Sequence, residues 1–182
     1  MGLLKKISII LCLAYFPWVQ AEPLSGSWEV KSGELTYHVH FVLKNIEGVS
    51  KEVKGKGQCE KKECQFLLAV PVKSFLSGDT NRDFHMLEVT KAPLHPMVTV
   101  RLKVPAEWTG SKIISDVDVQ FAGKSKTYKS LAIEVVNQTD QSAEVKGVLP
   151  MSLDDFSIEP PSLLGVEIEK KVPVDFTIYW SR

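Results

Sequence analysis

Alternation of apolar and polar side chains with a period of two is the feature that most limits what this chain can fold into. Successive side chains of a β-strand point to opposite faces, so this period predicts strands with one buried and one wet face. The apolar positions of the five clearest strands are Tyr37, Val39, Phe41 and Leu43; Val98, Val100, Leu102 and Val104; Ile113, Val117, Val119 and Phe121; Leu131, Ile133 and Val135; and Val172, Val174, Phe176, Ile178 and Trp180.

Four further segments fit strands with a weaker pattern: residues 26–31, 49–58, 65–72 and 144–152. Turn-forming residues are expected to link the strands, for example at 45–48 and 108–111. Eight or nine short strands with regular turn signals predict a sandwich or a barrel, so the chain is expected to be an all-β domain.

Two stretches interrupt this pattern. Asp79, Thr80 or Asn81 can cap a short helix near residues 81–89. Residues 156–164, which include two prolines, are predicted to form a loop packed over one end of a barrel.

The N-terminus has the pattern of a removable export signal. Lys5 and Lys6 precede an uncharged apolar run that ends near Ala21. A membrane span needs roughly 20 apolar residues, so this run is short for an anchor, although a retained anchor is the alternative. We therefore expect a signal peptide over 1–21 and one domain over 22–182, periplasmic or secreted after cleavage.

Two cysteines, Cys59 and Cys64, remain after cleavage. An even number of cysteines in an exported chain favours a disulfide, here across the polar tip of a hairpin. A metal site would need more cysteines or histidines nearby, and a redox site would favour a shorter spacing. Neither metal nor cofactor is expected.

Charge and motifs exclude several classes of function. Without Lys5 and Lys6 the chain has 20 basic and 22 acidic residues, which gives nucleic acid no basic surface to bind. No GxSxG elbow, HExxH or glycine-rich phosphate loop is present. Asp83 and His85, two residues apart on the expected helix, would not face each other as an acid–base pair. We do not expect an enzyme.

Several features follow one another in a set order: Trp28 before a strand with Val39 and Phe41, the segment 82–87, a proline before the strand at 96–100, the glycine turn at 121–126, and the segment 155–168. This order resembles that of the YceI-like family of exported lipid-binding proteins. Residues 82–87 are similar to the family's Arg-Asp-x-His-Leu helix, 121–126 to its Gly-x-Thr-Lys turn, and 155–168 to its last strands. This resemblance implies a single extended antiparallel eight-stranded lipocalin-like barrel with one short helix near 81–89. It also implies a polyisoprenoid or similar amphiphile in the pore.

A barrel of about eight strands can be filled by side chains or can hold one slender ligand. If it is hollow, the apolar face predicts the pore lining: Phe41, Leu43, Phe66, Leu68, Val70, Val98, Val100, Leu102, Val119, Phe121, Ile133, Val135, Phe176 and Ile178. The alternative for each of these residues is an ordinary packed core.

The helical stretch supplies the predicted mouth of the pore. Its polar residues are Arg82, Asp83 and His85, and its apolar rim is Phe75, Phe84, Met86 and Leu87. The Arg82 cation could meet a phosphate or quinone oxygen of a lipid head group, or it could pair with Asp83 and hold the loop and helix together.

His38 and His40 lie two residues apart on the polar face of a strand, as strand-borne metal ligands do. No third ligand is near in sequence, so a solvated outer strand is the favoured interpretation.

The sequence therefore predicts a carrier that binds an isoprenoid, quinone-like or other amphiphilic lipid. Transient membrane contact and a homodimer are compatible with it. The alternatives are a solid barrel that docks a partner and, less favoured, a hydrolase or isomerase at Asp83 and His85.

Overall fold

The computed structural model describes residues 24–41, 44–108, 110–163 and 166–182. The predicted signal peptide and the predicted pore residue Leu43 lie outside the described residues. In chain order the elements are β1 (Gly26–Phe41), β2 (Lys44–Ser50), β3 (Lys54–Glu60), β4 (Glu63–Pro71), the 3₁₀ helix η1 (Val72–Ser74), α1 (Thr80–Val89), β5 (Met97–Pro105), β6 (Lys112–Phe121), β7 (Lys124–Gln138), β8 (Ser142–Leu149), the 3₁₀ helix η2 (Leu153–Phe156), β9 (Ser162–Leu163), β10 (Val166–Glu167) and β11 (Val174–Ser181).

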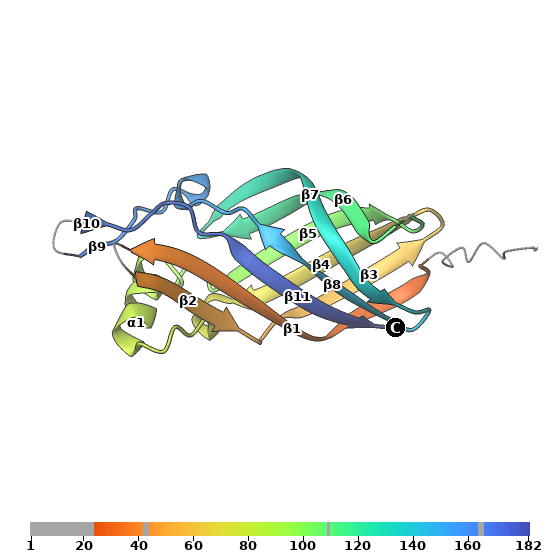
Figure 1. The fold of residues 1–182 in the computed structure, drawn as a ribbon, viewed down its shortest axis with the longest axis horizontal. Coiled ribbons are helices and arrows are strands. Elements are labelled where there is room, and N and C mark those ends of the chain that lie inside the picture. Colours follow the sequence, from red (N-terminus) through yellow and green to blue (C-terminus); the bar gives the residue numbers. More distant parts are fainter. Residues whose placement is uncertain (1–23, 42–43, 109, 164–165) are drawn as a thin grey trace, which may run out of the picture.

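Eight strands form a closed antiparallel barrel that is drawn out along the long axis of the molecule (Figure 1). Around the barrel the order is β1-β3-β4-β5-β6-β7-β8-β11, and the pairing of β11 with β1 closes the ring. β2 is an additional strand beside β1. The all-β, eight-stranded antiparallel barrel with one short helix is therefore confirmed.

β1 is one strand of 16 residues where the alternation predicts two separate strands. Its pairing with β11 shifts register between Val30 and Ser32. Trp28, before the shift, and Tyr37, after it, both line the interior although one number is even and the other odd. An extra residue in a strand exchanges its two faces. The alternation of apolar and polar residues therefore changes phase at this point, although the strand itself continues.

Residues 45–48, predicted as a link, lie inside β2 instead. Gly48 is directly opposite Tyr37 of β1, and the tyrosine ring occupies the space that a Gly48 side chain would need. This glycine therefore marks a close approach within a sheet and not a turn. The strand predicted for 49–58 is interrupted at 51–53, so that β2 and β3 pair with different parts of β1.

The predicted helix is confirmed as α1, and Asp79 is its N-cap, with a side chain that accepts a hydrogen bond from the Arg82 backbone N–H at 3.1 Å. No helix in the described part of the chain is long and apolar enough to cross a membrane. α1 lies at the same end of the barrel as β9 and β10, opposite the C-terminus (Figure 1). We call this the helix end.

The loop predicted at 156–164 starts at the last residue of η2 and includes β9, which pairs with β10 just after it. Phe156 and Ile158 are buried in it, and the Phe156 ring packs edge-on against Phe121 with 5.4 Å between centroids. This segment therefore covers the helix end of the interior.

At the opposite end, which we call the closed end, Cys59 and Cys64 form the predicted disulfide across the β3–β4 hairpin. Both cysteines are buried. The Ala106 N–H donates to the Lys62 carbonyl, and the Leu24 N–H donates to the Ala106 carbonyl, each at 2.9 Å. These bonds draw the chain over this end of the interior.

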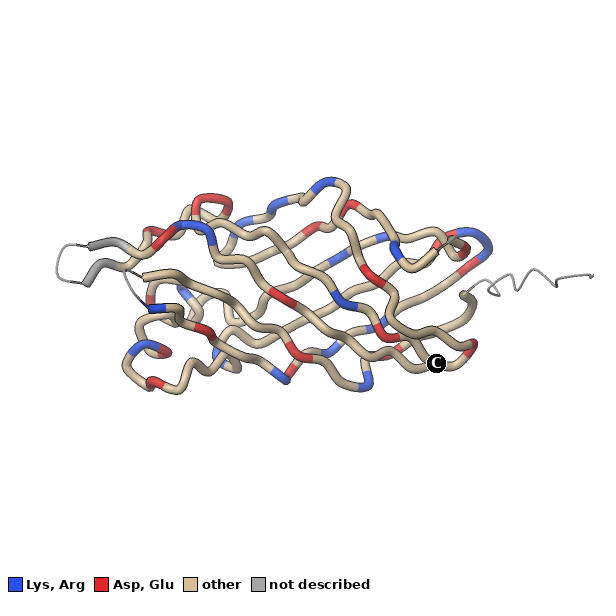
Figure 2. The backbone as a smooth tube through the Cα atoms, viewed as in Figure 1, with Lys and Arg blue, Asp and Glu red and all other residues tan. Residues whose placement is uncertain are grey.

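Basic and acidic residues are interspersed along the barrel wall (Figure 2). Ion pairs such as Lys103–Glu63, at 3.2 Å, join exposed side chains of neighbouring strands. The polar residues of the alternating strands therefore lie on the outer face of the barrel.

We expect the double substitution Cys59→Ala and Cys64→Ala to lower the free energy of unfolding by about 2 kcal/mol, because the bridge closes only a short loop. Urea denaturation monitored by tryptophan fluorescence measures this loss. Wild-type protein under reducing conditions is the control and should unfold at a similar midpoint. An unchanged midpoint in both samples would contradict a stabilising bridge.

Candidate functional site

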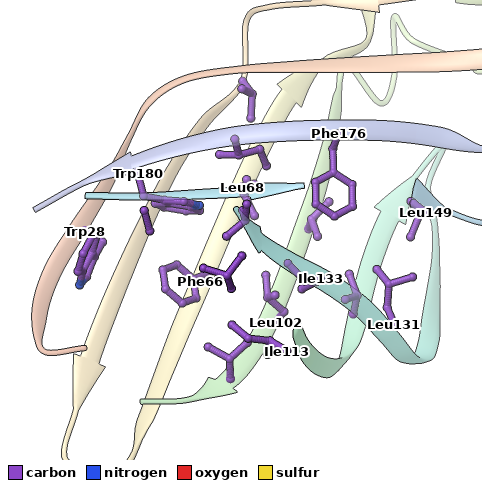
Figure 3. Close-up of a pocket in the computed structure, with 18 of the residues that line it drawn as sticks. Trp28, Phe66, Leu68, Leu102, Ile113, Leu131, Ile133, Leu149, Phe176 and Trp180 are labelled. Atoms are coloured by element: carbon purple, nitrogen blue, oxygen red, sulfur yellow. The ribbon is translucent and has the colours of Figure 1, made fainter. Parts of the chain in front are cut away.

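Two apolar cavities lie inside the barrel. The closed-end cavity has a volume of about 130 Å³, and Trp28, Phe66 and Trp180 lie at one end of it (Figure 3). The helix-end cavity, of about 200 Å³, is lined by residues of the barrel wall and by Met86 of α1. The interior is therefore not completely filled by side chains.

Most of the predicted pore residues line these cavities. Those at the closed-end cavity are Phe66, Leu68, Leu102, Ile133, Val135, Phe176 and Ile178. Those at the helix-end cavity are Phe75, Met86, Val98, Val119 and Phe121. Val70 and Val100 line both.

Three predicted apolar residues lie elsewhere among the described residues. Phe41 is half-buried at the end of β1, beyond its pairing with β11, and does not line either cavity. Leu87 packs in the hydrophobic cluster below α1. Phe84 is 63% exposed, because α1 turns Met86 toward the barrel and Phe84 away from it.

The sequence interpretation left out several lining residues. Trp180 and Leu149 border the closed-end cavity, and Tyr37 and Val39 border the helix-end cavity. Trp180 shares the face of Phe176 and Ile178, so the alternation could have identified it. Trp28 lies beyond the register shift of β1, so the alternation could not connect it to Tyr37.

Three aromatic side chains of the lining each pack over the glycine opposite them on the neighbouring strand. The pairs are Tyr37 with Gly48, Phe66 with Gly57, and Phe176 with Gly147. A Cβ atom on Gly147 would lie 2.7 Å from Cζ of Phe176, closer than real side chains allow. The glycines thus give these rings room along the wall, and less of each ring projects across the bore.

Polar groups meet the helix-end cavity where α1 covers it. Arg82 and His85 line this cavity, but Asp83 does not. The Arg82 guanidinium donates to the Ser77 hydroxyl and carbonyl, both at 2.8 Å, and the Asp83 carboxylate accepts from the Ser77 N–H at 3.0 Å. The two charges therefore hold the loop through Ser77, and among the hydrogen bonds and ion pairs of the described residues there is none between them.

Tyr37 places a phenol at the same cavity. Burial raises the pKa of Tyr37 above 10.0, the nearby Asp83 charge raises it further, and Arg82 opposes the rise. The hydroxyl is therefore protonated at neutral pH and can donate a hydrogen bond. An apolar interior with a cation and a hydroxyl near one end suits an amphiphile whose tail points inward.

The acid–base pair considered for Asp83 and His85 is not assembled. Asp83 is engaged by Ser77, and Nδ1 of His85 lies 3.3 Å from the Glu88 carboxylate. Asp83 and His85 thus bind different partners.

The histidines of β1 point to the outer face. Nε2 of His38 lies 3.0 Å from the Asp175 carboxylate, and Nδ1 of His40 lies 2.7 Å from the Asn45 side-chain oxygen. Among the described residues no three His, Cys, Asp or Glu side chains are grouped as a metal site would require.

Asp155 anchors the cover at the helix end. Its carboxylate accepts hydrogen bonds from the Tyr128 hydroxyl and the Lys126 ammonium, both at 2.9 Å, and from the Ser152 N–H at 3.2 Å. Burial raises the pKa of Asp155, but the hydrogen bonds from Lys126 and Tyr128 outweigh it, so that the pKa lies below 3.8. The charged carboxylate thus ties η2 to β7.

We expect Gly147→Ala to lower the free energy of unfolding by about 1–3 kcal/mol, because the added methyl group overlaps the Phe176 ring. Urea denaturation checks this value. The same substitution in a Phe176→Leu background should cost less, because the smaller side chain can move aside. Equal costs in the two backgrounds would contradict the proposed packing.

We expect Asp155→Asn to lower the melting temperature at neutral pH and to lose its effect in acid. A carboxyl group whose pKa is depressed by folding stabilises the protein above its unfolded pKa, and this stability is lost as the pH falls below about 4. Thermal denaturation of wild type and variant across this pH range measures the difference. Asp154→Asn is the control, because the Asp154 side chain is exposed and its one ion pair within the described part of the chain is with Lys170. A difference between wild type and Asp155→Asn that persists undiminished at low pH would contradict this role.

Comparison with known proteins finds similar structures but no similar sequence family. No protein-family model and no curated protein sequence matches the chain. A polyisoprenoid-binding domain from Saccharophagus degradans, implicated in plant cell wall breakdown, has a TM-score of 0.70 at 15% identity, over 85% of this chain and 97% of that one. BcnA of Burkholderia cenocepacia has a TM-score of 0.69 at 18% identity, over 81% of this chain and 95% of that one.

The YceI protein of Campylobacter jejuni has a TM-score of 0.61 at 16% identity, over 79% of this chain and 88% of that one. Each likeness extends over most of both chains. At these identities the shared property is the fold. The chain therefore has the barrel fold of the YceI proteins, as the resemblance in its sequence implies.

Proposed function

We propose that this protein is a carrier that holds a long-chain isoprenoid or similar amphiphilic lipid in its barrel. The observation that carries the proposal is the pair of apolar cavities inside a closed sheet. Each methylene moved from water into such a space contributes roughly 0.8 kcal/mol, so an aliphatic chain binds there without polar help. Shape and length then decide which chain fits.

The polar groups near α1 support one orientation for the ligand. Arg82, His85 and Tyr37 are among the residues that line the helix-end cavity, whereas no charged side chain of the described residues lines the closed-end cavity. A head group with phosphate or carbonyl oxygens gains hydrogen bonds at the first site and would lose its hydration at the second. The head therefore lies beneath α1 and the tail points toward the disulfide.

The barrel fold shared with a polyisoprenoid-binding domain supports the class of ligand. The chemistry of the lining favours the same class, because branched aliphatic and aromatic walls match a methyl-branched chain. A quinone carries such a chain on a polar ring and belongs to the same proposal.

The proposed location of the protein rests on its N-terminal segment and on the Cys59–Cys64 disulfide. Lys5, Lys6 and the apolar run up to Ala21 have the pattern of an export signal, and a buried disulfide suits an oxidising compartment. We infer that the carrier works in the periplasm or outside the cell, where an insoluble lipid must cross water.

Detection of a lipid bound to the protein is the direct test of this proposal. Native mass spectrometry of the protein isolated from its own cells should reveal a lipid adduct, and delipidated protein should take up a fluorescent polyprenyl probe. A solid barrel that only docks a partner would give a clean mass and no uptake, and that result would overturn the proposal.

A pair of variants on β5 locates the binding. Val98→Phe adds a ring inside the helix-end cavity and should weaken uptake of the probe by about tenfold or more, through lost tail contacts. Thr99→Phe adds the same ring to the outer face, where Thr99 contacts Gln120, and should bind as wild type does. Fluorescence titration measures both. Equal binding by the two variants would place the ligand outside the barrel.

A further inference from the structure

The two cavities meet at a ring of five apolar side chains. The residues that line both cavities are Leu35, Val70, Val100, Leu149 and Val174. We call this ring the waist. On its closed-end side lie cavity residues such as Leu68 and Leu102, and on its helix-end side lie Val98 and Val119.

The waist spans the bore from two sides. Leu35, Leu149 and Val174 come from the adjacent strands β1, β8 and β11, whereas Val70 and Val100 come from β4 and β5. In the order around the barrel, β3 separates these two groups on one side, and β6 and β7 separate them on the other. The two groups of branched side chains therefore face each other across the interior.

Phe176 lies beside the waist and could close it. Its partners across the sheet are Leu35 of β1 and Gly147 of β8. The missing side chain at Gly147 gives the ring its place at the wall, since a Cβ there would lie 2.7 Å from Cζ. The space beside the waist thus depends on a large residue, Phe176, being paired with the smallest one, Gly147.

We propose that the waist selects ligands by chain length, an inference that rests on the proposed lipid carrier. A short isoprenoid fills only the helix-end cavity. A longer chain threads through the waist and fills the closed-end cavity as well, which adds buried apolar surface and affinity. The aliphatic waist offers no partner to a charged or hydrated head group, so only the tail passes.

Binding of farnesol, geranylgeraniol and solanesol, whose chains increase in length in that order, tests this inference. Each alcohol is titrated against the wild-type protein loaded with a fluorescent polyprenyl probe, and its dissociation constant follows from displacement. We expect affinity to rise by about tenfold or more from the shortest to the longest chain. Val100→Phe places a ring in the waist and should abolish this rise while farnesol still binds.

Val98→Phe is the matched control, because the same substitution two residues away lies in the helix-end cavity alone. It should weaken all three alcohols. Leu149→Ala widens the waist and adds no bulk to it. This variant therefore tests the role of the waist if Val100→Phe fails to fold. Retinol, whose chain ends in a ring, should bind Leu149→Ala several-fold more tightly than wild type.

The outcomes separate this inference from the proposed function. Wild-type protein that takes up neither the polyprenyl probe nor any of the alcohols overturns the carrier itself. Wild-type protein that binds all three with equal affinity overturns only the selection by length, as does a folded Val100→Phe variant that keeps the full rise. A Leu149→Ala variant with unchanged affinity for retinol also overturns the role of the waist.

Discussion

The antiparallel pairing of β11 with β1 closes the sheet, and the interior of this protein depends on that closure. Along its other edge β1 pairs first with β3 and then with β2, so this one strand belongs to both ends of the barrel. Once the ring is closed, the backbone groups of its strands bond to one another and the apolar faces point to a shared interior. The disulfide and the cover with η2 then close the two ends.

Pairing of aromatic residues with glycines favours an interior that is hollow and not solid. A barrel of eight strands is just narrow enough for side chains to fill it. Phe66 and Phe176 lie over Gly57 and Gly147 of the neighbouring strands, and these large residues therefore line the wall. The space left between the walls is apolar, so it favours a hydrocarbon chain over water.

The two ends of the barrel differ in chemistry, and this difference gives the proposed ligand a direction. At the closed end the tryptophans and the disulfide provide no charge. At the helix end Arg82 is oriented by Ser77, and Asp155 ties the cover to β7. In the proposed carrier, the tail of the amphiphile would lie deep in the barrel and its head beneath α1.

The sequence by itself predicted most of the barrel strands, the helix near 81–89, the disulfide and part of the cavity lining, because strand alternation and capping are local properties. Alternation could not reveal that residues 26–41 form one strand, since the register shift exchanges its faces, or that Gly48 lies in a strand and not in a turn. Only the tertiary structure decided that Phe84 faces solvent, that Arg82 and Asp83 meet at Ser77, and that the interior is open. Those properties depend on which side chains from distant strands occupy the same space, and local pattern carries no information about that.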